Sequence, residues 1–142
     1  MSQNLIAKVE VNINAPVSKV WEALTNPHII KQYLFGTEVV TDWSVGSPII
    51  WKGVWQGKPY EDKGKIVQII PEKLLETTYW SSMAGLSDKP ENFKKVTYAL
   101  SKENSNTKLI LTQDNNISKE DVIHSEQNWK MVLDGLKKLL EE

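Results

Sequence analysis

Few side chains in this sequence could act as an acid or a base in an enzyme, and three carboxylates stand out by their position. Asp62, Asp114 and Glu126 lie on or near segments that should border a space between a sheet and a helix. One or two carboxylates in an apolar cavity are enough for general acid–base catalysis. Asp62 lies beside a turn and Asp114 ends a strand, so we expect solvated surface positions for both. Glu126 lies near the apolar stripe of a helix, and we expect it at the flank of that stripe.

Other kinds of catalysis lack the residues that they need. The two histidines, His28 and His124, lie in different segments without a carboxylate at metal-ligand spacing, so we expect no metal ion and no cofactor. The chain contains no cysteine, which excludes a thiolate nucleophile and a disulfide. It also contains no glycine-rich phosphate loop and no G-x-S-x-G nucleophile elbow. The sequence therefore predicts no catalytic residue.

Aromatic side chains are the most unusual feature of the chain. Six tryptophans and four tyrosines are spread over almost every predicted element. Trp51 and Trp55 lie an even number of residues apart, so on a strand they point to the same face. Lysines flank them, but Glu61 and Asp62 interrupt the basic residues and the formal net charge is -1, which argues against nucleic acid as a partner. We therefore expect these rings in a core or in a ligand cavity.

Length and composition are those of one globular unit. A chain of 142 residues with 40% apolar and 25% charged residues can bury one substantial core, so we expect a single domain over residues 1–142. The first residues lack the basic start and the apolar run of a signal peptide. No stretch approaches the roughly 18 apolar residues of a membrane span. We expect a cytoplasmic protein without stable membrane insertion.

The elements that must position these side chains begin with a strand and two short helices. Residues 5–13 alternate between apolar and polar, as in a half-buried strand. Asn14 and Pro16 then predict a helix start, with Asn14 as the cap and Pro16 in the first turn. Pro27 ends that helix and begins a second one through about Tyr33.

Residues 35–113 predict about six strands. Turn residues at 45–48, 56–59, 70–73 and 103–106 separate them, so neighbouring strands should form an antiparallel meander. Residues 81–92, with Gly85 and Pro90, predict a longer loop.

The last segment predicts a long amphipathic helix. Ser118 and Asp121 match a capping box, and a helix of about 22 residues would be roughly 33 Å long. A helix of this length laid across a curved sheet leaves an apolar cavity beneath it, of the kind that binds small molecules. Its apolar stripe consists of Val122, Trp129, Val132, Leu133, Leu136 and Leu140.

Several motifs along nearly the whole chain match one family. Residues 14–27 read NAPVSKVWEALTNP, residues 64–71 read GKIVQIIP before KLLE at 73–76, and residues 107–112 read TKLILT. Asn128 and Trp129 open the leucine-rich end of the last helix. The chain thereby resembles START-like (SRPBCC) domains, and more narrowly the branch homologous to the activator of the heat-shock-protein (Hsp90) ATPase, the AHSA type.

The resemblance implies an α+β helix-grip fold, also called birch-pollen-allergen-like. In that fold a curved antiparallel sheet of about six or seven strands wraps around the long C-terminal helix, and two short helices follow the first strand. Members bind lipids, polyketides, hormones or other apolar molecules, and a minority are cyclases or hydrolases. Fold alone does not choose among these functions.

Together these observations predict a protein that binds a small apolar ligand without performing chemistry, as a monomer or a weak homodimer. If Trp51 and Trp55 point away from the last helix, Ile50 and Val54 line the cavity in their place. We also expect Trp129→Ala to cost about 3–5 kcal/mol by opening a cavity between helix and sheet. The predicted ligand-binding residues are Tyr33, Trp51, Trp55, Val67, Tyr79, Trp80, Met83, Tyr98 and Trp129.

Two other functions stay open. The first is a cyclase- or hydratase-type enzyme that uses a cavity carboxylate or tyrosine, which requires a residue such as Asp114 or Glu126 to face an enclosed cavity. The second is an interaction module that contacts the Hsp90 chaperone and activates its ATPase.

Overall fold

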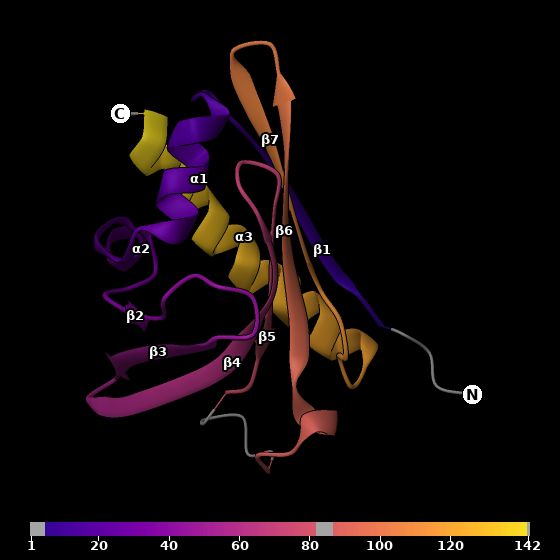
Figure 1. The fold of residues 1–142 in the computed structure, drawn as a ribbon. Helices are drawn as coiled ribbons and strands as arrows, with labels where there is room; N and C mark the ends of the chain where they lie inside the picture. The colour runs from indigo at the N-terminus through magenta and orange to yellow at the C-terminus, as the bar shows by residue number, and fades with distance from the viewer. Residues whose placement is uncertain (1–4, 82–86, 142) are drawn as a thin grey trace.

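A strongly bent antiparallel sheet grips one long helix (Figure 1). The computed structural model describes residues 5–81 and 87–141, and over these residues seven strands follow the order β1-β7-β6-β5-β4-β3-β2. The predicted α+β helix-grip fold is thereby confirmed. The elements in chain order are β1 (Ala7–Ile13), α1 (Val17–Thr25), α2 (Pro27–Tyr33), β2 (Glu38–Val40), β3 (Pro48–Trp55), β4 (Lys58–Ile70), β5 (Leu74–Tyr79), the short 3-10 helix η1 (Pro90–Asn92), β6 (Lys94–Glu103), β7 (Asn106–Gln113) and α3 (Lys119–Glu141).

The starts of the two short helices differ in their caps. The Asn26 side chain accepts a hydrogen bond of 3.0 Å from the His28 N–H, so the predicted break and restart at Pro27 is confirmed. The prediction for Asn14 is wrong, because Pro16 is the cap residue of α1 and no side chain caps that helix. The backbone N–H of Asn14 instead donates to Glu141 Oε2 at the other end of the chain, at 2.8 Å.

The bend of the sheet lies in β4. The first half of this 13-residue strand pairs with β3 and the second half with β5, and the register shifts between Ile66 and Gln68. Such a bulge bends a strand and increases its twist. At Gly64 an added Cβ would lie 1.8 Å from the Thr78 carbonyl oxygen, so glycine allows β5 to approach. In Figure 1, β3 and β4 accordingly run away from the direction of β6 and β7.

The hairpin between β3 and β4 turns at Gln56 and Gly57. Both residues have positive φ, 50° and 81°, as a two-residue type I′ turn requires. The predicted turn at 56–59 is therefore confirmed. It places Trp51 directly opposite Asp62 on the neighbouring strand, so these two side chains point to the same face.

The long helix α3 begins as the sequence predicts. The Asp121 N–H donates to Ser118 Oγ at 3.0 Å, and the Asp121 carboxylate accepts from the Ile117 N–H at 3.0 Å. The helix then runs for 23 residues along the concave side of the sheet (Figure 1). No helix among the described residues is long and apolar enough to cross a membrane.

Side chains of α3 also cover the outer edge of β1. Glu126 Oε2 accepts from the Lys8 N–H at 2.9 Å, and Lys137 Nζ donates to the Asn12 carbonyl at 2.7 Å. Together with the bond from Asn14 to Glu141, these contacts satisfy backbone groups that an edge strand leaves without strand partners. Glu126 therefore lies at the flank of the helix stripe, as predicted, and is bound to the backbone of β1.

Candidate ligand-binding cavity

A cavity of about 600 Å³ lies between the first half of α3 and the concave side of the sheet. Its volume is within the usual range for small-molecule sites. From the sheet side it is lined by Trp51, Val54, Tyr60, Asp62, Thr77, Tyr79, Lys94, Val96, Tyr98 and Gln113. The segment between α2 and β2 adds Leu34, Phe35 and Thr37, and α3 adds His124, Ser125, Asn128, Trp129, Met131 and Val132.

Two pairs of aromatic rings form much of the wall. Trp51 meets Tyr79 edge-on with ring centroids 5.2 Å apart, across the bend of the sheet. Tyr98 meets Trp129 of α3 at 6.1 Å and an interplanar angle of 89°. Edge-to-face pairs are favourable beyond the area that they bury, so they hold the four rings in defined orientations. The wall is therefore both apolar and stiff.

Asp62 is a carboxylate in this wall. It is 6% exposed, and its Oδ2 accepts a hydrogen bond of 2.7 Å from the Tyr79 hydroxyl. Burial raises the pKa of Tyr79 well above its ordinary value, and the nearby Asp62 charge raises it further. The phenol consequently stays protonated and donates to the carboxylate. The expectation that Asp62 is a solvated surface residue is wrong, because the strand continues past the turn into the concave face, where the Tyr79 hydroxyl meets the carboxylate.

Gln113 fixes Trp129 and the start of α3. Its side-chain oxygen accepts from the Trp129 indole N–H at 2.9 Å, and its amide nitrogen donates to Ser125 Oγ at 3.1 Å and to Asn116 Oδ1 at 3.2 Å. Gln113 is 5% exposed, so these bonds replace water that it cannot reach. The amide thereby ties the end of β7 to one face of the helix.

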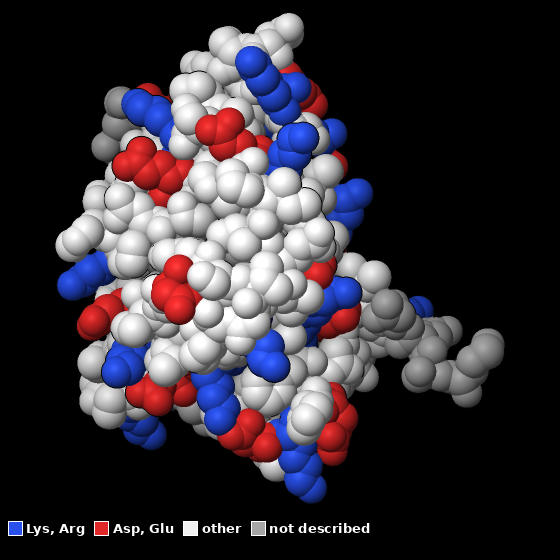
Figure 2. Space-filling view, viewed as in Figure 1, with Lys and Arg blue, Asp and Glu red and all other residues white. Residues whose placement is uncertain are grey.

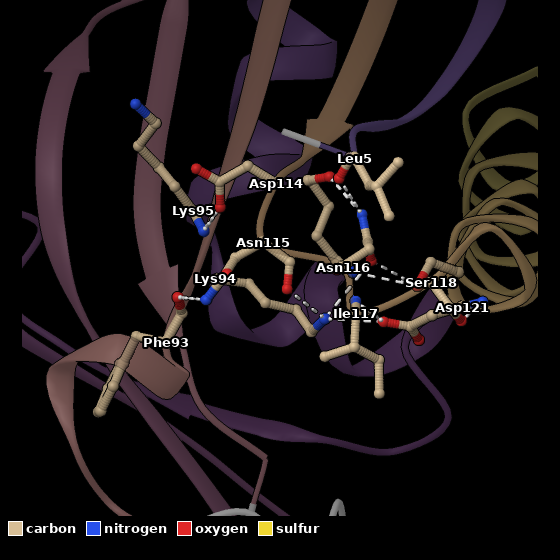
Figure 3. Close-up of polar contacts among 12 residues, drawn as sticks. Leu5, Phe93, Lys94, Lys95, Asp114, Asn115, Asn116, Ile117, Ser118 and Asp121 are labelled. Atoms are coloured by element: carbon tan, nitrogen blue, oxygen red, sulfur yellow. Dashed lines mark hydrogen bonds and ion pairs between the residues drawn. The ribbon is translucent and has the colours of Figure 1, made fainter. Parts of the chain in front are cut away.

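Lys94 also lines the cavity, and Figure 3 shows its contacts with Asn115, Asn116 and Asp121. Its ammonium lies 3.2 Å from Asp121 Oδ2, 3.4 Å from Asn116 Oδ1 and 3.3 Å from the Asn115 carbonyl. Partial burial raises the pKa of Asp121, but the Ile117 N–H and Lys94 outweigh that effect, so this pKa lies below its ordinary value. The positive charge of Lys94 is thus compensated by Asp121 in the first turn of α3.

The mouth of the cavity is apolar. Phe35, Val54 and Met131 line it and remain 56%, 63% and 55% exposed. Beside them the Tyr60 ring lies over Gly53, where an added Cβ would lie 2.5 Å from the Tyr60 hydroxyl oxygen. That hydroxyl is 2.5 Å from Thr37 Oγ1, so both contacts lie at the hydroxyl end of the ring.

A small recess of about 30 Å³ adjoins the cavity on the side of α1 and α2. Trp51, Tyr98 and Trp129 line both spaces, and Tyr33 lines the recess. The Tyr33 hydroxyl donates to the Ala23 carbonyl at 2.8 Å, and burial raises the pKa of this phenol. The Tyr33 hydroxyl therefore binds the backbone near the end of α1, and the Tyr33 residue lines the recess.

The buried polar atoms of the wall have partners within the described part of the protein. Among the described residues, no buried side-chain nitrogen or oxygen lacks a hydrogen bond. The same residues contain no group of three or more histidine, aspartate or glutamate side chains that could hold a metal ion. The arrangement is suited to enclosing an apolar molecule and to contacting it at a few polar positions.

A family model agrees with this geometry. Residues 14–141 match the model described as "Activator of Hsp90 ATPase homolog 1-like protein". The chain belongs to this family.

Solved structures of the Hsp90 ATPase activator homologue family and its fold relatives extend the comparison. ChR145 from Cytophaga hutchinsonii, solved in solution, is 51% identical over 99% of this chain and 97% of its own, with a TM-score of 0.87. The Aha1 dimer from Colwellia psychrerythraea is 22% identical over 96% of each chain, with a TM-score of 0.75. CalU16 from Micromonospora echinospora is 22% identical over 97% of this chain and 85% of its own, with a TM-score of 0.71. No curated protein matches the sequence.

Within this family fold, the structure gathers five of the predicted ligand-binding residues around the cavity and its recess. Trp51, Tyr79, Tyr98 and Trp129 line the cavity, and Tyr33 lines the recess. The facing of Trp51 that the sequence left open is thereby settled, and Val54 also reaches the mouth of the cavity. The side chain of Trp55 and all of Met83 lie outside the described residues.

Two predicted residues lie elsewhere. Val67 is 39% exposed and follows Ile66, which is fully buried, so Val67 points to the outer face of the sheet. Trp80 follows Tyr79 and has the opposite facing for the same reason. Its indole N–H donates to the Ser87 carbonyl at 3.1 Å, and its ring stacks on Phe93. Neither side chain lines the cavity.

Sequence reasoning weighed Asp62 but assigned it to the surface, and it missed Gln113; the other two carboxylates that it weighed lie outside the wall. Asp114 Oδ1 accepts from the Lys95 N–H at 2.6 Å, and Glu126 accepts from the Lys8 N–H, so neither faces the cavity. The signal for Asp62 was the alternation in β4, since Tyr60 and Asp62 share a face that Trp51 also shares. Gln113 carried no comparable local signal, because its partners Ser125 and Trp129 come from a later helix.

Proposed function

We propose that this protein binds a small apolar molecule in the cavity between α3 and the sheet, without performing chemistry on it. The observation that carries the proposal is the cavity of about 600 Å³ walled by Trp51, Tyr79, Tyr98 and Trp129. Burial of apolar ligand surface contributes about 25 cal/mol per Å², less the costs of association, so an aromatic or aliphatic molecule would gain from entering. We place the protein in the cytoplasm, as one domain.

A cavity-filling variant tests this binding function. Val132 lies on α3, is 7% exposed, and lines both the cavity and the recess, so Val132→Phe should occupy ligand space. The matched control is Val67→Phe on the outer face, which adds the same atoms outside the cavity. Aromatic and aliphatic compounds are titrated into each protein while its tryptophan fluorescence is followed. We expect saturable quenching of that fluorescence in wild type and in Val67→Phe, and no saturable quenching in Val132→Phe. Native mass spectrometry should detect the bound molecule, and a panel without any saturable binding to wild type contradicts the proposal.

The family description supports a chaperone contact as a second candidate. The matching family model bears the name of an Hsp90 ATPase activator. The exposed mouth residues Phe35, Val54 and Met131 offer an apolar surface that a partner could cover. Addition of the protein to purified Hsp90 should then raise ATP hydrolysis, and the rise should disappear in Met131→Ser. An unchanged ATPase rate rejects this candidate.

Asp62 supports acid–base catalysis as a third candidate. A carboxylate in an apolar wall beside a protonated tyrosine can exchange a proton with a bound molecule. Mass spectrometry of the compound recovered after incubation would show a changed product with wild type and an unchanged compound with Asp62→Asn. Recovery of the unchanged compound from wild type favours binding alone.

A further inference from the structure

Among the described residues that line the cavity, Asp62 is the acidic one, and its charge is negative. Asp62 is 6% exposed, lines the cavity and holds the Tyr79 hydroxyl at 2.7 Å. A carboxylate offers lone pairs and no proton, so it favours ligand groups that donate hydrogen bonds. It also repels an anion brought into the same low-dielectric space.

The basic side chain in the wall does not reverse this sign. Lys94 lines the cavity, but its ammonium is bound to Asp121, Asn116 and the Asn115 carbonyl (Figure 3). Asp121 compensates its charge at 3.2 Å. His124 also borders the cavity, but it lies exposed on α3. A ligand that carries a carboxylate would therefore meet the Lys94 ammonium already paired with Asp121, and it would be repelled by the Asp62 carboxylate.

The rings around Asp62 add to the preference for a positive charge. Trp51 stands directly opposite Asp62 in the β3–β4 register, and Tyr60 precedes Asp62 by two residues on the same face. Tyr79 completes the group through its hydrogen bond to the carboxylate and its ring contact with Trp51. Aromatic rings attract cations, and a carboxylate among such rings is suited to an ammonium group.

We propose that Asp62, with Trp51, Tyr60 and Tyr79 around it, selects ligands that carry a protonated amine on an apolar body. This inference rests on the proposed binding function and names the ligand class. Asp62 is the specificity-determining residue, since it supplies the charge. Tyr79 is a positioning residue, because its hydroxyl orients the carboxylate. A neutral alcohol would bind less tightly, and a carboxylic acid least.

Three probes with one apolar body test the proposal at pH 7. They are 2-naphthylmethylamine, 2-naphthalenemethanol and 2-naphthoic acid, each titrated into the full chain by isothermal calorimetry. Because a hydrogen bond to a charged group is stronger than one between neutral groups, we expect the amine to bind at least about tenfold more tightly than the acid. The alcohol should lie between them.

Two variants assign that preference to one side chain. Asp62→Asn should weaken amine binding by about tenfold or more and bring the acid closer to the alcohol. The matched control is Glu61→Gln, which removes the same charge from the neighbouring residue, whose side chain is 62% exposed and lies 3.9 Å from the Lys52 ammonium. We expect this control to bind all three probes as wild type does.

The outcomes separate this inference from the binding function. Equal affinity for the three probes, or tightest binding of the acid, overturns the amine preference and leaves the binding function standing. An equal effect of Glu61→Gln and Asp62→Asn overturns the role of Asp62, because the preference would then come from overall charge. If no probe and no other apolar compound binds to wild type, both proposals fail. If Asp62→Asn does not fold, the order of the three affinities in wild type decides.

Discussion

The two halves of α3 lie against the same sheet but differ in how closely they are packed. In the second half, Leu133 and Leu136 are 1% and 0% exposed and pack in the main core. In the first half, Ser125, Asn128 and Trp129 face a cavity. The contrast is between a helix segment that fills its space and one that leaves its space open.

The two short helices account for the difference. Val20, Ala23 and Leu24 of α1 belong to the same core cluster as Leu133 and Leu136, so α1 fills the space beside the second half of α3. No helix among the described residues takes that place beside the first half, where β3 and β4 turn away at the bend of the sheet (Figure 1). The cavity is therefore set by where α1 and α2 end as much as by the rings that line it.

The largest expected effect is in the filled half. Leu136→Ala should lower the free energy of unfolding by about 3–4 kcal/mol, because a fully buried leucine leaves a hole that its neighbours only partly close. Urea unfolding followed by circular dichroism measures this change. Met131→Ala on the same helix is the control, since that side chain is 55% exposed, and it should cost less than about 0.5 kcal/mol. Similar losses for the two variants would show that Leu136 does not lie in a well-packed core.

Trp129→Ala should have a smaller effect, of about 2 kcal/mol. The range of 3–5 kcal/mol expected from the sequence assumed a filled site, whereas Trp129 borders a cavity that already exists. The loss combines the ring contact with Tyr98 and the hydrogen bond to Gln113. Trp129→Phe keeps a ring and removes the indole N–H, so it separates the two contributions. A loss of 4 kcal/mol or more for Trp129→Ala would mean that the first half is packed like the second.

Acid should weaken the contacts at the start of α3. The pKa of Asp121 is lowered in the folded protein, so its stabilising contribution is complete above its unfolded pKa of about 3.9 and is lost as the pH falls through the lower folded value. Asp121→Asn should cost about 1 kcal/mol at pH 7 and should flatten the fall in stability below pH 4. Urea unfolding at pH 7, 4 and 3 measures both. If the free energy of unfolding falls equally with pH in wild type and Asp121→Asn, Asp121 does not contribute to the acid sensitivity.

The fold could be predicted because its signals are local. The alternation of residues 5–13, the turn at Gln56 and Gly57, and the cap at Ser118 each depend on a few neighbouring residues, and the structure has all three. The wrong prediction of a cap at Asn14 shows the limit of local signals. The Asn14 N–H donates to Glu141, which lies at the far end of the chain.

The cavity wall could be predicted in part. Strand facing separates Tyr79 from Trp80 by adjacency alone, so both could not line one cavity. Val67 directly follows the buried Ile66, so its outward facing follows from the same alternation once the facing of Ile66 is known. Asp62 was assigned to the surface from its nearness to a turn, whereas it is buried and bound to Tyr79 of β5, a partner 17 residues away in the sequence.

The smallest change in the free energy of unfolding should come from substitution of Glu126. This residue lies on the side of α3 that contacts β1, away from the side that lines the cavity. Glu126 accepts from the Lys8 N–H at 2.9 Å at an exposed position and does not line the cavity. Glu126→Gln keeps an acceptor for that N–H and should change the free energy of unfolding by about 0.5 kcal/mol or less. Naphthylmethylamine affinity should equal that of wild type, whereas Asp62→Asn reduces it. Glu126→Gln and Asp62→Asn each remove one carboxylate charge. If both variants lose affinity for naphthylmethylamine, binding depends on the charge anywhere near α3. If only Asp62→Asn loses affinity, amine recognition is assigned to Asp62 at the bend of the sheet.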